Sequence, residues 1–192
     1  MRIDIVTGFP RLAEAPLSES IVKRAREKGL VTIVVHDLRN HAEDKHRTID
    51  DAPYGGGAGM ILKPKPIFGC IESLQSERKY DEVIYLTADG ERFTQRTANV
   101  LSMKANLLLL CGHYKGVDER VRQALVTREL SIGDYVLTGG ELPALVVVDS
   151  IVRLIPGVVN DAESLLNDSF QDDLLGSPAY TRPAEFRGMK VP

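Results

Sequence analysis

The chain has 192 residues, enough for one ordinary domain, or for one domain with a small appendage. Its 43% hydrophobic and 27% charged residues are the balance of a globular protein that can bury a core. The formal net charge of −3 excludes a globally basic protein, so a nucleic-acid partner has to be held by a local patch. With no Trp, six Tyr and five Phe, a large exposed platform for base stacking is not expected.

Three features predict a soluble, cytoplasmic protein. Cys70 and Cys111 are far apart and form neither a C-x-x-C motif nor a secretory spacing, which favours a reducing compartment. Residues 1–6 lack the basic and apolar regions of a signal peptide. The apolar run from Ala144 to Val148 is far too short to cross a bilayer, so no membrane partner is expected.

Short β-branched runs alternate with helical patterns. In chain order, we expect a strand at Ile3–Val6, a helix at Ser18–Lys28, a strand at Val31–Val35, a helix at Pro64–Ser76, a strand at Val83–Leu86, a helix at Thr94–Met103, a strand at Leu107–Cys111 and a helix at Val117–Val126. Ser18 is the predicted N-cap and Gly29 the predicted C′ residue of the first helix. Because near-continuous apolar strands are typical of sheets covered on both faces, the predicted fold class is α/β, with a mostly parallel sheet flanked by helices.

A further helix is predicted from Pro143 to Ile155, with the proline in its first turn and Pro156-Gly157 ending it. It is apolar on nearly every face; after the first turn, its only polar residues are Asp149, Ser150 and Arg153. Such a helix has to be buried, either in the core or against a second subunit.

The segment from Leu154 to Thr181 changes in character, because it holds five acidic residues and no Lys or Arg. We interpret it as a partly mobile linker. It leads to a short basic tail that contains Arg182, Arg187 and Lys190.

Four loops are candidates for chemistry, at Pro53–Met60, Tyr85–Gly90, Cys111–Arg120 and Ser131–Pro143. Ligands of open α/β sheets bind at the carboxyl ends of the strands, so three of these loops could meet at one pocket. Their backbone groups can read the edge of an adenine without a charged side chain. The first loop is neither a P-loop nor a G-x-G-x-x-G motif, so a structural turn and a ligand loop both stay open.

Other chemistries lack support. His36, His41 and His46 are spaced by five residues, which places no metal-ligand pair on one helix face, and they are interpreted as polar loop histidines. No metal site is predicted. The sequence has no G-x-S-x-G elbow and no recognisable Cys–His pair, so nucleophilic hydrolysis is not expected.

The segment Ser131–Ala144, SIGDYVLTGGELPA, is similar almost residue for residue to the signature of the TrmD-type bacterial tRNA (guanine-N1)-methyltransferases. Four further segments resemble that family in the same order: His46–Gly57, Cys111–Arg120, Ile155–Val158 and Asp168–Pro183. Together these segments extend the resemblance to essentially the whole chain.

The resemblance implies a SPOUT-type α/β fold with a deep trefoil knot in its C-terminal part, a topology that connection rules alone exclude. It implies a homodimer with active sites at the interface. The implied reaction transfers a methyl group from S-adenosylmethionine to N1 of the tRNA guanosine immediately 3′ of the anticodon. The implied domains are a methyltransferase domain at 1–156, a flexible acidic linker at 157–181 and, at 182–192, the start of a tRNA-binding domain that is largely absent.

The resemblance also assigns site residues. Asp168 matches the family's general base, and Arg153 matches its arginine near the target guanine. The expected cofactor-binding residues are Leu86, Thr87, Gly112, Ile132, Gly133, Asp134, Tyr135, Val136, Leu137, Gly139, Gly140 and Pro143. The expected substrate-binding residues are Tyr54, Gly55, Gly56, Gly57 and Ser169.

The two catalytic assignments have alternatives. Arg153 could pair with Asp149 one helical turn earlier, a contact worth about 0.2–0.5 kcal/mol on an exposed helix. Asp168 could be a helix cap or one of the solvated acids of the linker. Without the resemblance, the solvated acid would be the preferred interpretation of Asp168.

The chain departs from the family pattern in two loops. Many members have Arg-Tyr-Glu-Gly where this chain has His113-Tyr114-Lys115-Gly116, so the charge at Lys115 is reversed. The family's suggested Mg²⁺ therefore cannot be carried over from that glutamate. Ala88-Asp89 also replaces a common Pro-Gln. Two alternative functions stay open: a related methyltransferase acting on another RNA, and a non-catalytic module that binds S-adenosylmethionine and RNA.

Overall fold

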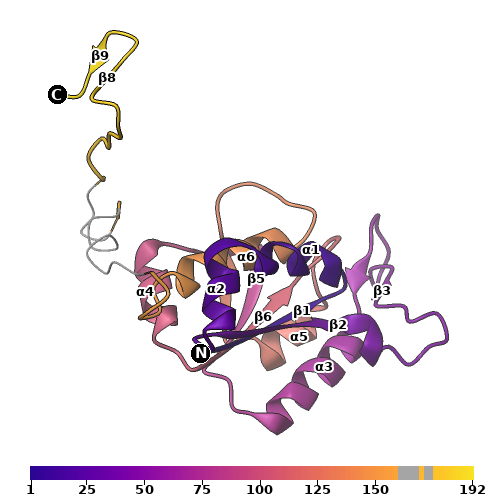
Figure 1. The fold of residues 1–192 in the computed structure, drawn as a ribbon. Helices are drawn as coiled ribbons and strands as arrows, with labels where there is room; N and C mark the ends of the chain where they lie inside the picture. Colours follow the sequence, from indigo (N-terminus) through magenta and orange to yellow (C-terminus); the bar gives the residue numbers. More distant parts are fainter. Residues whose placement is uncertain (160–168, 171–174) are drawn as a thin grey trace. The chain divides into compact units, whose positions relative to one another are not determined.

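The computed structural model describes residues 1–159, 169–170 and 175–192, which belong to two compact units, Met1–Asn160 and Asp161–Pro192 (Figure 1). The strands of the first unit are β1 (Arg2–Thr7), β2 (Thr32–Asp37), β3 (Asp50–Asp51), β4 (Ile61–Leu62), β5 (Glu82–Arg92), β6 (Asn106–Cys111) and β7 (Arg128–Ser131). Its helices are α1 (Pro10–Glu14), α2 (Ser20–Glu27), α3 (Pro64–Glu77), α4 (Gln95–Ser102), α5 (Glu119–Leu125) and α6 (Glu141–Val152), with short 3₁₀ helices η1 (Pro16–Ser18) and η2 (Leu38–His41).

The central sheet has five strands in the order β2-β1-β6-β5-β7, and every neighbouring pair is parallel. This confirms the predicted α/β class with a mostly parallel sheet. The edge strand β7 was not predicted, because Arg128 and Glu129 interrupt the apolar run that marks the other strands. The trefoil knot stays a prediction, since strand order alone does not test it.

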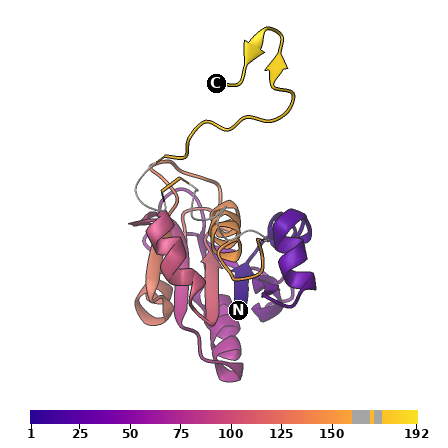
Figure 2. The same cartoon turned by 60° about the vertical axis from the view of Figure 1, so that its left-hand side comes forward.

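Helices cover both faces of the sheet (Figures 1 and 2). Because successive side chains of a strand point to opposite faces, Leu107 and Leu109 of β6 belong to one core cluster and Leu108 and Leu110 to another. The first cluster includes buried residues of α2, α4 and α6; the second includes those of α3 and α5. Burial on both faces explains why the strands are apolar without alternation.

The first predicted helix begins later than expected. Ser18 does not cap it: this residue ends η1, and its hydroxyl donates to the carbonyl of Glu14. Helix α2 starts at Ser20, whose φ is +52°, after the extended residue Glu19. The other end agrees with the prediction, since Gly29 follows the last turn with φ +70°, a left-handed conformation that glycine adopts at little cost.

Helix α6 is buried in the core on one side, as predicted, and burial of its other side against a second subunit stays a prediction. Ala144, Val147, Val148 and Ile151 are fully buried in the core. Leu142 and Val146, on the other side, are 57% and 44% exposed. The helix also ends at Val152, before Pro156-Gly157, and the chain continues in turns.

The loop predicted at Tyr85–Gly90 is instead part of a long, irregular strand. In β5, both Leu86 and Glu91 pair with Leu130 of β7, so residues 87–90 bulge out between them. A bulge re-aims side chains at the end of a strand without ending the pairing. Gly90 is needed there, because a Cβ atom on it would lie 2.7 Å from the backbone of Glu129.

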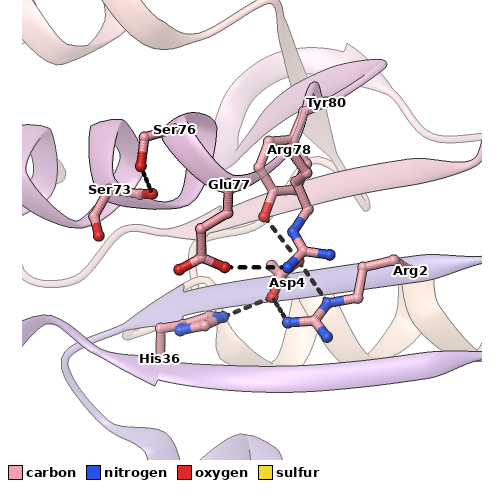
Figure 3. A network of polar contacts seen from close by, with 8 residues as sticks. All are labelled: Arg2, Asp4, His36, Ser73, Ser76, Glu77, Arg78 and Tyr80. Atoms are coloured by element: carbon pink, nitrogen blue, oxygen red, sulfur yellow. Dashed lines mark hydrogen bonds and ion pairs between the residues drawn. The ribbon is translucent and has the colours of Figure 1, made fainter.

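A buried carboxylate links the first two strands (Figure 3). Asp4 of β1 is fully buried, and its oxygens contact Arg2 at 2.7 Å, His36 Nε2 at 2.6 Å and the donating hydroxyl of Tyr80 at 2.8 Å. The interpretation of His36 as a loop histidine is therefore wrong: it lies in β2 and pairs with a core acid.

The second unit contains a small antiparallel hairpin, β8 (Glu185–Phe186) and β9 (Met189–Lys190). Arg187 and Gly188, between the strands, have φ of +52° and +79°, as a tight type I′ turn requires. The hairpin was not predicted, since the tail was read only as a basic segment. Residues 160–168 and 171–174 of the predicted linker, which include Asp168, lie outside the described residues.

Candidate functional site

A cavity of about 400 Å³ lies at the carboxyl ends of the adjacent strands β6, β5 and β7. Three segments form its walls: the bulge after Leu86, the turn that begins at Gly112 and the loop that follows Ser131. This is the edge at which open parallel sheets bind ligands, and the volume suits a small organic molecule. The convergence of three loops on one pocket is thus confirmed.

Most of the residues expected to bind the cofactor line this cavity. They are Leu86, Thr87, Gly112, Ile132, Gly133, Tyr135, Val136, Leu137, Gly139, Gly140 and Pro143. Asp134 is not among the lining residues; its exposed carboxylate instead forms an ion pair with Arg92 at 3.0 Å. Tyr85, Ala88, His113, Tyr114, Lys115, Gly116, Leu130, Ser131 and Thr138 also line the cavity, although no role was assigned to them from the sequence.

Close backbone contacts explain two of the pocket's glycines. The amide of Gly140 donates to the carbonyl of Gly112 at 2.8 Å. A Cβ atom on Gly140 would lie 2.7 Å from Cys111 Cα, and one on Gly112 would lie 2.9 Å from the hydroxyl oxygen of Tyr85. The two loops can therefore meet only because Gly140 lacks a side chain, and Gly112 leaves room for the Tyr85 ring.

A polar cluster supports the pocket from beneath. Glu141, the first residue of α6, is buried; its Oε1 accepts a hydrogen bond from the Thr7 hydroxyl at 2.6 Å. Its Oε2 lies 3.8 Å from His113 Nδ1, a buried atom with no hydrogen bond among the described residues. The His113 ring packs on Phe9 with their centroids 4.1 Å apart. This cluster joins the end of β1 and the start of α6 to the pocket's middle loop.

Charged contacts hold the β5 bulge in place. Asp89 accepts a hydrogen bond from the Thr87 hydroxyl and forms an ion pair with Arg122 of α5 at 3.0 Å. Arg122 also contacts Glu129 of β7 at 2.6 Å. The hydrogen bond from Thr87, together with Arg122, holds the pKa of Asp89 below its usual range. Asp89 thus stays charged and fixes the part of the bulge that lines the pocket.

The glycine-rich loop at Pro53–Met60 is exposed. Gly55, Gly56 and Gly57 have φ of +85°, +92° and +116°, and a Cβ atom on any of them would meet nothing within 4 Å. Backbone conformation, rather than packing, therefore requires these glycines. Tyr54 is fully exposed. The loop approaches the pocket at its end, where the Lys115 amide donates to the Met60 carbonyl at 3.1 Å.

Arg153, one of the two predicted catalytic residues, is not among the described residues that line this pocket. Arg153 follows the last turn of α6, whereas Pro143 in the first turn lines the cavity. Ten residues of helix separate them by about 15 Å along the axis. Asp168 lies outside the described residues, and Ser169 belongs to the second unit, where its Oγ accepts from the Gly176 amide at 2.9 Å.

The lining itself supplies binding groups rather than a nucleophile. Burial raises the pKa of Cys111, at the end of β6, well above its usual value, which keeps this thiol protonated. The described residues contain no group of three or more His, Cys, Asp or Glu side chains that could hold a metal ion. Free backbone groups and small side chains fit a nucleoside-sized organic cofactor.

Comparisons with known proteins agree with this geometry. Residues 1–192 match the family described as tRNA (Guanine-1)-methyltransferase TrmD. Two proteins named tRNA (guanine-N(1)-)-methyltransferase, from Bacteroides fragilis and Chlorobaculum tepidum, are each 58% identical over 100% of this chain and over 85% and 84% of their own lengths. The crystal structure of tRNA (m1G37) methyltransferase from Aquifex aeolicus superimposes with a TM-score of 0.85 at 38% identity, covering 100% of this chain and 80% of that one.

Proposed function

The chain belongs to the TrmD family of tRNA (guanine-N1)-methyltransferases, and we propose that its target is the guanosine immediately 3′ of the anticodon, position 37. The modification named for the Aquifex aeolicus relative supports this position. As a tRNA methyltransferase of this family, the chain uses S-adenosylmethionine. The relatives give no support to the alternative of a non-catalytic binding module. Within the described ranges, no helix combines the length and the apolar character needed to span a membrane. As a member of this tRNA-modifying family, the enzyme is proposed to act on tRNA in the cytoplasm.

The cavity at the ends of β5, β6 and β7 is the proposed cofactor site. Its volume of about 400 Å³ and its exposed loop backbone suit a nucleoside, and the Gly112–Gly140 contact holds two of its walls together. S-adenosylmethionine supplies an activated methyl group on a sulfonium centre. The backbone of the loop from Ile132 to Leu137 would bind the adenosine, and Leu86 and Thr87 would close the other side.

Guanine N1 carries a proton at neutral pH, which has to leave before its lone pair can form the new N–C bond. We assign Asp168 as the carboxylate that accepts this proton, and Arg153 as the cation that stabilises the negative charge developing on O6. When the bond between sulfur and the methyl group breaks, its electron pair stays on sulfur, so the leaving group needs no other acid or base. Ser169 and the exposed backbone of Gly55–Gly57 are the proposed contacts to the tRNA, together with the Tyr54 ring.

A homodimer explains how these residues meet. Within one chain, Arg153 lies at the far end of α6 from the pocket. Leu142 and Val146 of α6 are exposed, as is Leu12 of α1, which packs beside α6 (Figure 1). Large apolar side chains grouped in this way mark an interaction surface. We propose that a second copy covers this surface and that each pocket receives Arg153 and Asp168 from the partner subunit.

Methyl transfer from labelled S-adenosylmethionine to two tRNA transcripts, with G or A at position 37, tests the proposed function. Methylation of the G transcript alone, with the label recovered as 1-methylguanosine, is the expected result. Methylation of both transcripts, or of a guanosine elsewhere in the tRNA, would contradict the proposed target.

The proposed base is tested by Asp168→Asn. Loss of a positioned general base lowers turnover by about 10²- to 10⁴-fold. Because Asp168 is proposed to accept the proton of guanine N1 and not to contact the cofactor, the Kd for S-adenosylmethionine should stay unchanged. Calorimetry and single-turnover kinetics measure the two quantities separately, and near-normal turnover would remove Asp168 from the mechanism.

A further inference from the structure

Among the described residues that line the pocket, one charged side chain forms no ion pair. Lys115 lines the cavity, is exposed, and forms no ion pair with any residue in the described part of the chain. No Asp or Glu among the described residues lines the cavity, and its other basic group there, the ring of His113, faces Glu141. Among the described residues of its own chain, a ligand in this pocket therefore meets a single unpaired cation, since the partner subunit's Arg153 is proposed to face the guanine O6.

The position of Lys115 is well defined. Its amide donates to the Met60 carbonyl, and the next amide, that of Gly116, donates to the His113 carbonyl at 2.9 Å. Its alkyl stem packs against Gly59, where a Cβ atom would lie 2.9 Å from Lys115 Cε. Gly59 has φ +91° and leaves room for this stem. The stem is thus held between two loops while the ammonium remains exposed.

The chemistry of the cofactor indicates what this ammonium binds. The adenine and ribose of S-adenosylmethionine are neutral and can be bound by loop backbone, whereas its amino-acid end carries a carboxylate. A carboxylate removed from water needs a charged or hydrogen-bonding partner. Among the lining residues, only Lys115 offers an unpaired cation. On the basis of the proposed cofactor site, we propose that Lys115 binds the carboxylate of S-adenosylmethionine and selects ligands that carry this amino-acid end.

Two thioether ligands, both without the sulfonium charge, separate the contribution of the amino-acid end from that of the nucleoside. S-adenosylhomocysteine carries the carboxylate, while 5′-methylthioadenosine has the same nucleoside and thioether without it. Lys115→Met removes the charge but keeps an alkyl stem for Gly59. It should raise the Kd for S-adenosylhomocysteine about tenfold and leave the Kd for 5′-methylthioadenosine unchanged, which also shows that the pocket is intact. Lys115→Arg should largely restore binding.

Lys104→Gln is the matched control, because Lys104 precedes β6 at the opposite end of the sheet, and it should change neither Kd. Equal Kd values for S-adenosylhomocysteine in wild type and Lys115→Met would overturn the inference. A normal Kd for S-adenosylhomocysteine combined with a raised KM for tRNA would also overturn it. The salt dependence of tRNA binding would then fall by about one phosphate contact, and this result would assign Lys115 to the RNA. If the wild-type protein bound neither ligand, the proposed cofactor site itself would be wrong.

Discussion

At the scale of single residues, the pocket depends as much on missing side chains as on those present. Gly112 and Gly140 bring two loops into backbone contact, and Gly90 lets the β5 bulge return against β7. In each case the atoms nearest to an added Cβ belong to the backbone or to a packed ring, and displacing them would cost free energy. Of these glycines, only Gly140 lies in the signature segment Ser131–Ala144, and all three are explained by the closeness of segments that are far apart in sequence.

Gly140→Ala should abolish cofactor binding. Its added methyl group would lie 2.7 Å from Cys111 Cα and 3.0 Å from the Gly112 amide nitrogen, so the two loops must separate. Overpacking of this kind costs about 1–3 kcal/mol. Urea denaturation and calorimetry with S-adenosylmethionine measure the two effects.

The control is Gly69→Ala in α3, where the nearest atom to an added Cβ lies 3.8 Å away. Alanine is a better helix former than glycine by about 0.5–1 kcal/mol, so this variant should be slightly more stable and should bind the cofactor normally. Normal cofactor affinity in Gly140→Ala would show that the loops have more freedom than the structure indicates.

At the scale of elements, the Asp4 cluster joins β1, β2 and the segment after α3 (Figure 3). Burial by itself raises the pKa of Asp4, but hydrogen bonds with His36, Arg2 and Tyr80 outweigh it and hold this pKa well below its usual range. A pKa lowered on folding adds stability that is complete above the unfolded value of about 3.9 and is lost as the pH falls towards the folded value.

Asp4→Asn should therefore destabilise the protein by about 2–3 kcal/mol at pH 7, the scale of hydrogen bonds to a charged group. The difference from wild type should shrink as the pH falls below about 4, because wild type then loses the same contribution. Urea denaturation at pH 7 and pH 3 measures this. Tyr80→Phe, which removes one of the three contacts, should have a smaller effect, and a pH-independent loss in Asp4→Asn would assign the stability to packing instead.

At the scale of the whole molecule, α6 serves two surfaces. One side fills the core with Val147 and Ile151; the other presents Leu142 and Val146 beside α1. The same helix separates Arg153 from the pocket by about 15 Å. One chain thus has a binding pocket at one end of α6 and the proposed catalytic arginine at the other, which a symmetric dimer can combine.

Mixed dimers test this arrangement. Gly140→Ala disables a pocket, and Arg153→Ala removes the arginine, so each homodimer should be inactive. If Arg153 acts across the interface, a dimer with one chain of each kind contains one complete site and should recover about half of the wild-type rate. Purification with two different tags isolates that species, and methylation of tRNA reports it. An inactive mixed dimer would place Arg153 in the pocket of its own chain.

The pattern of apolar residues and the glycines that end helices were enough to predict most of the main elements from the sequence. Apolar runs identified four of the five strands of the sheet, and the glycine after α2 identified the end of that helix, because burial on two faces and a left-handed turn each demand particular residue types. The three loops of the pocket could also be predicted, because the strand ends of a parallel sheet share one edge.

The tertiary structure alone decided the rest. It turned Thr87–Gly90 into a bulge, paired His36 with Asp4, packed the Lys115 stem against Gly59 and left one side of α6 exposed. These features depend on which distant segments meet, and local residue patterns carry no information about such contacts.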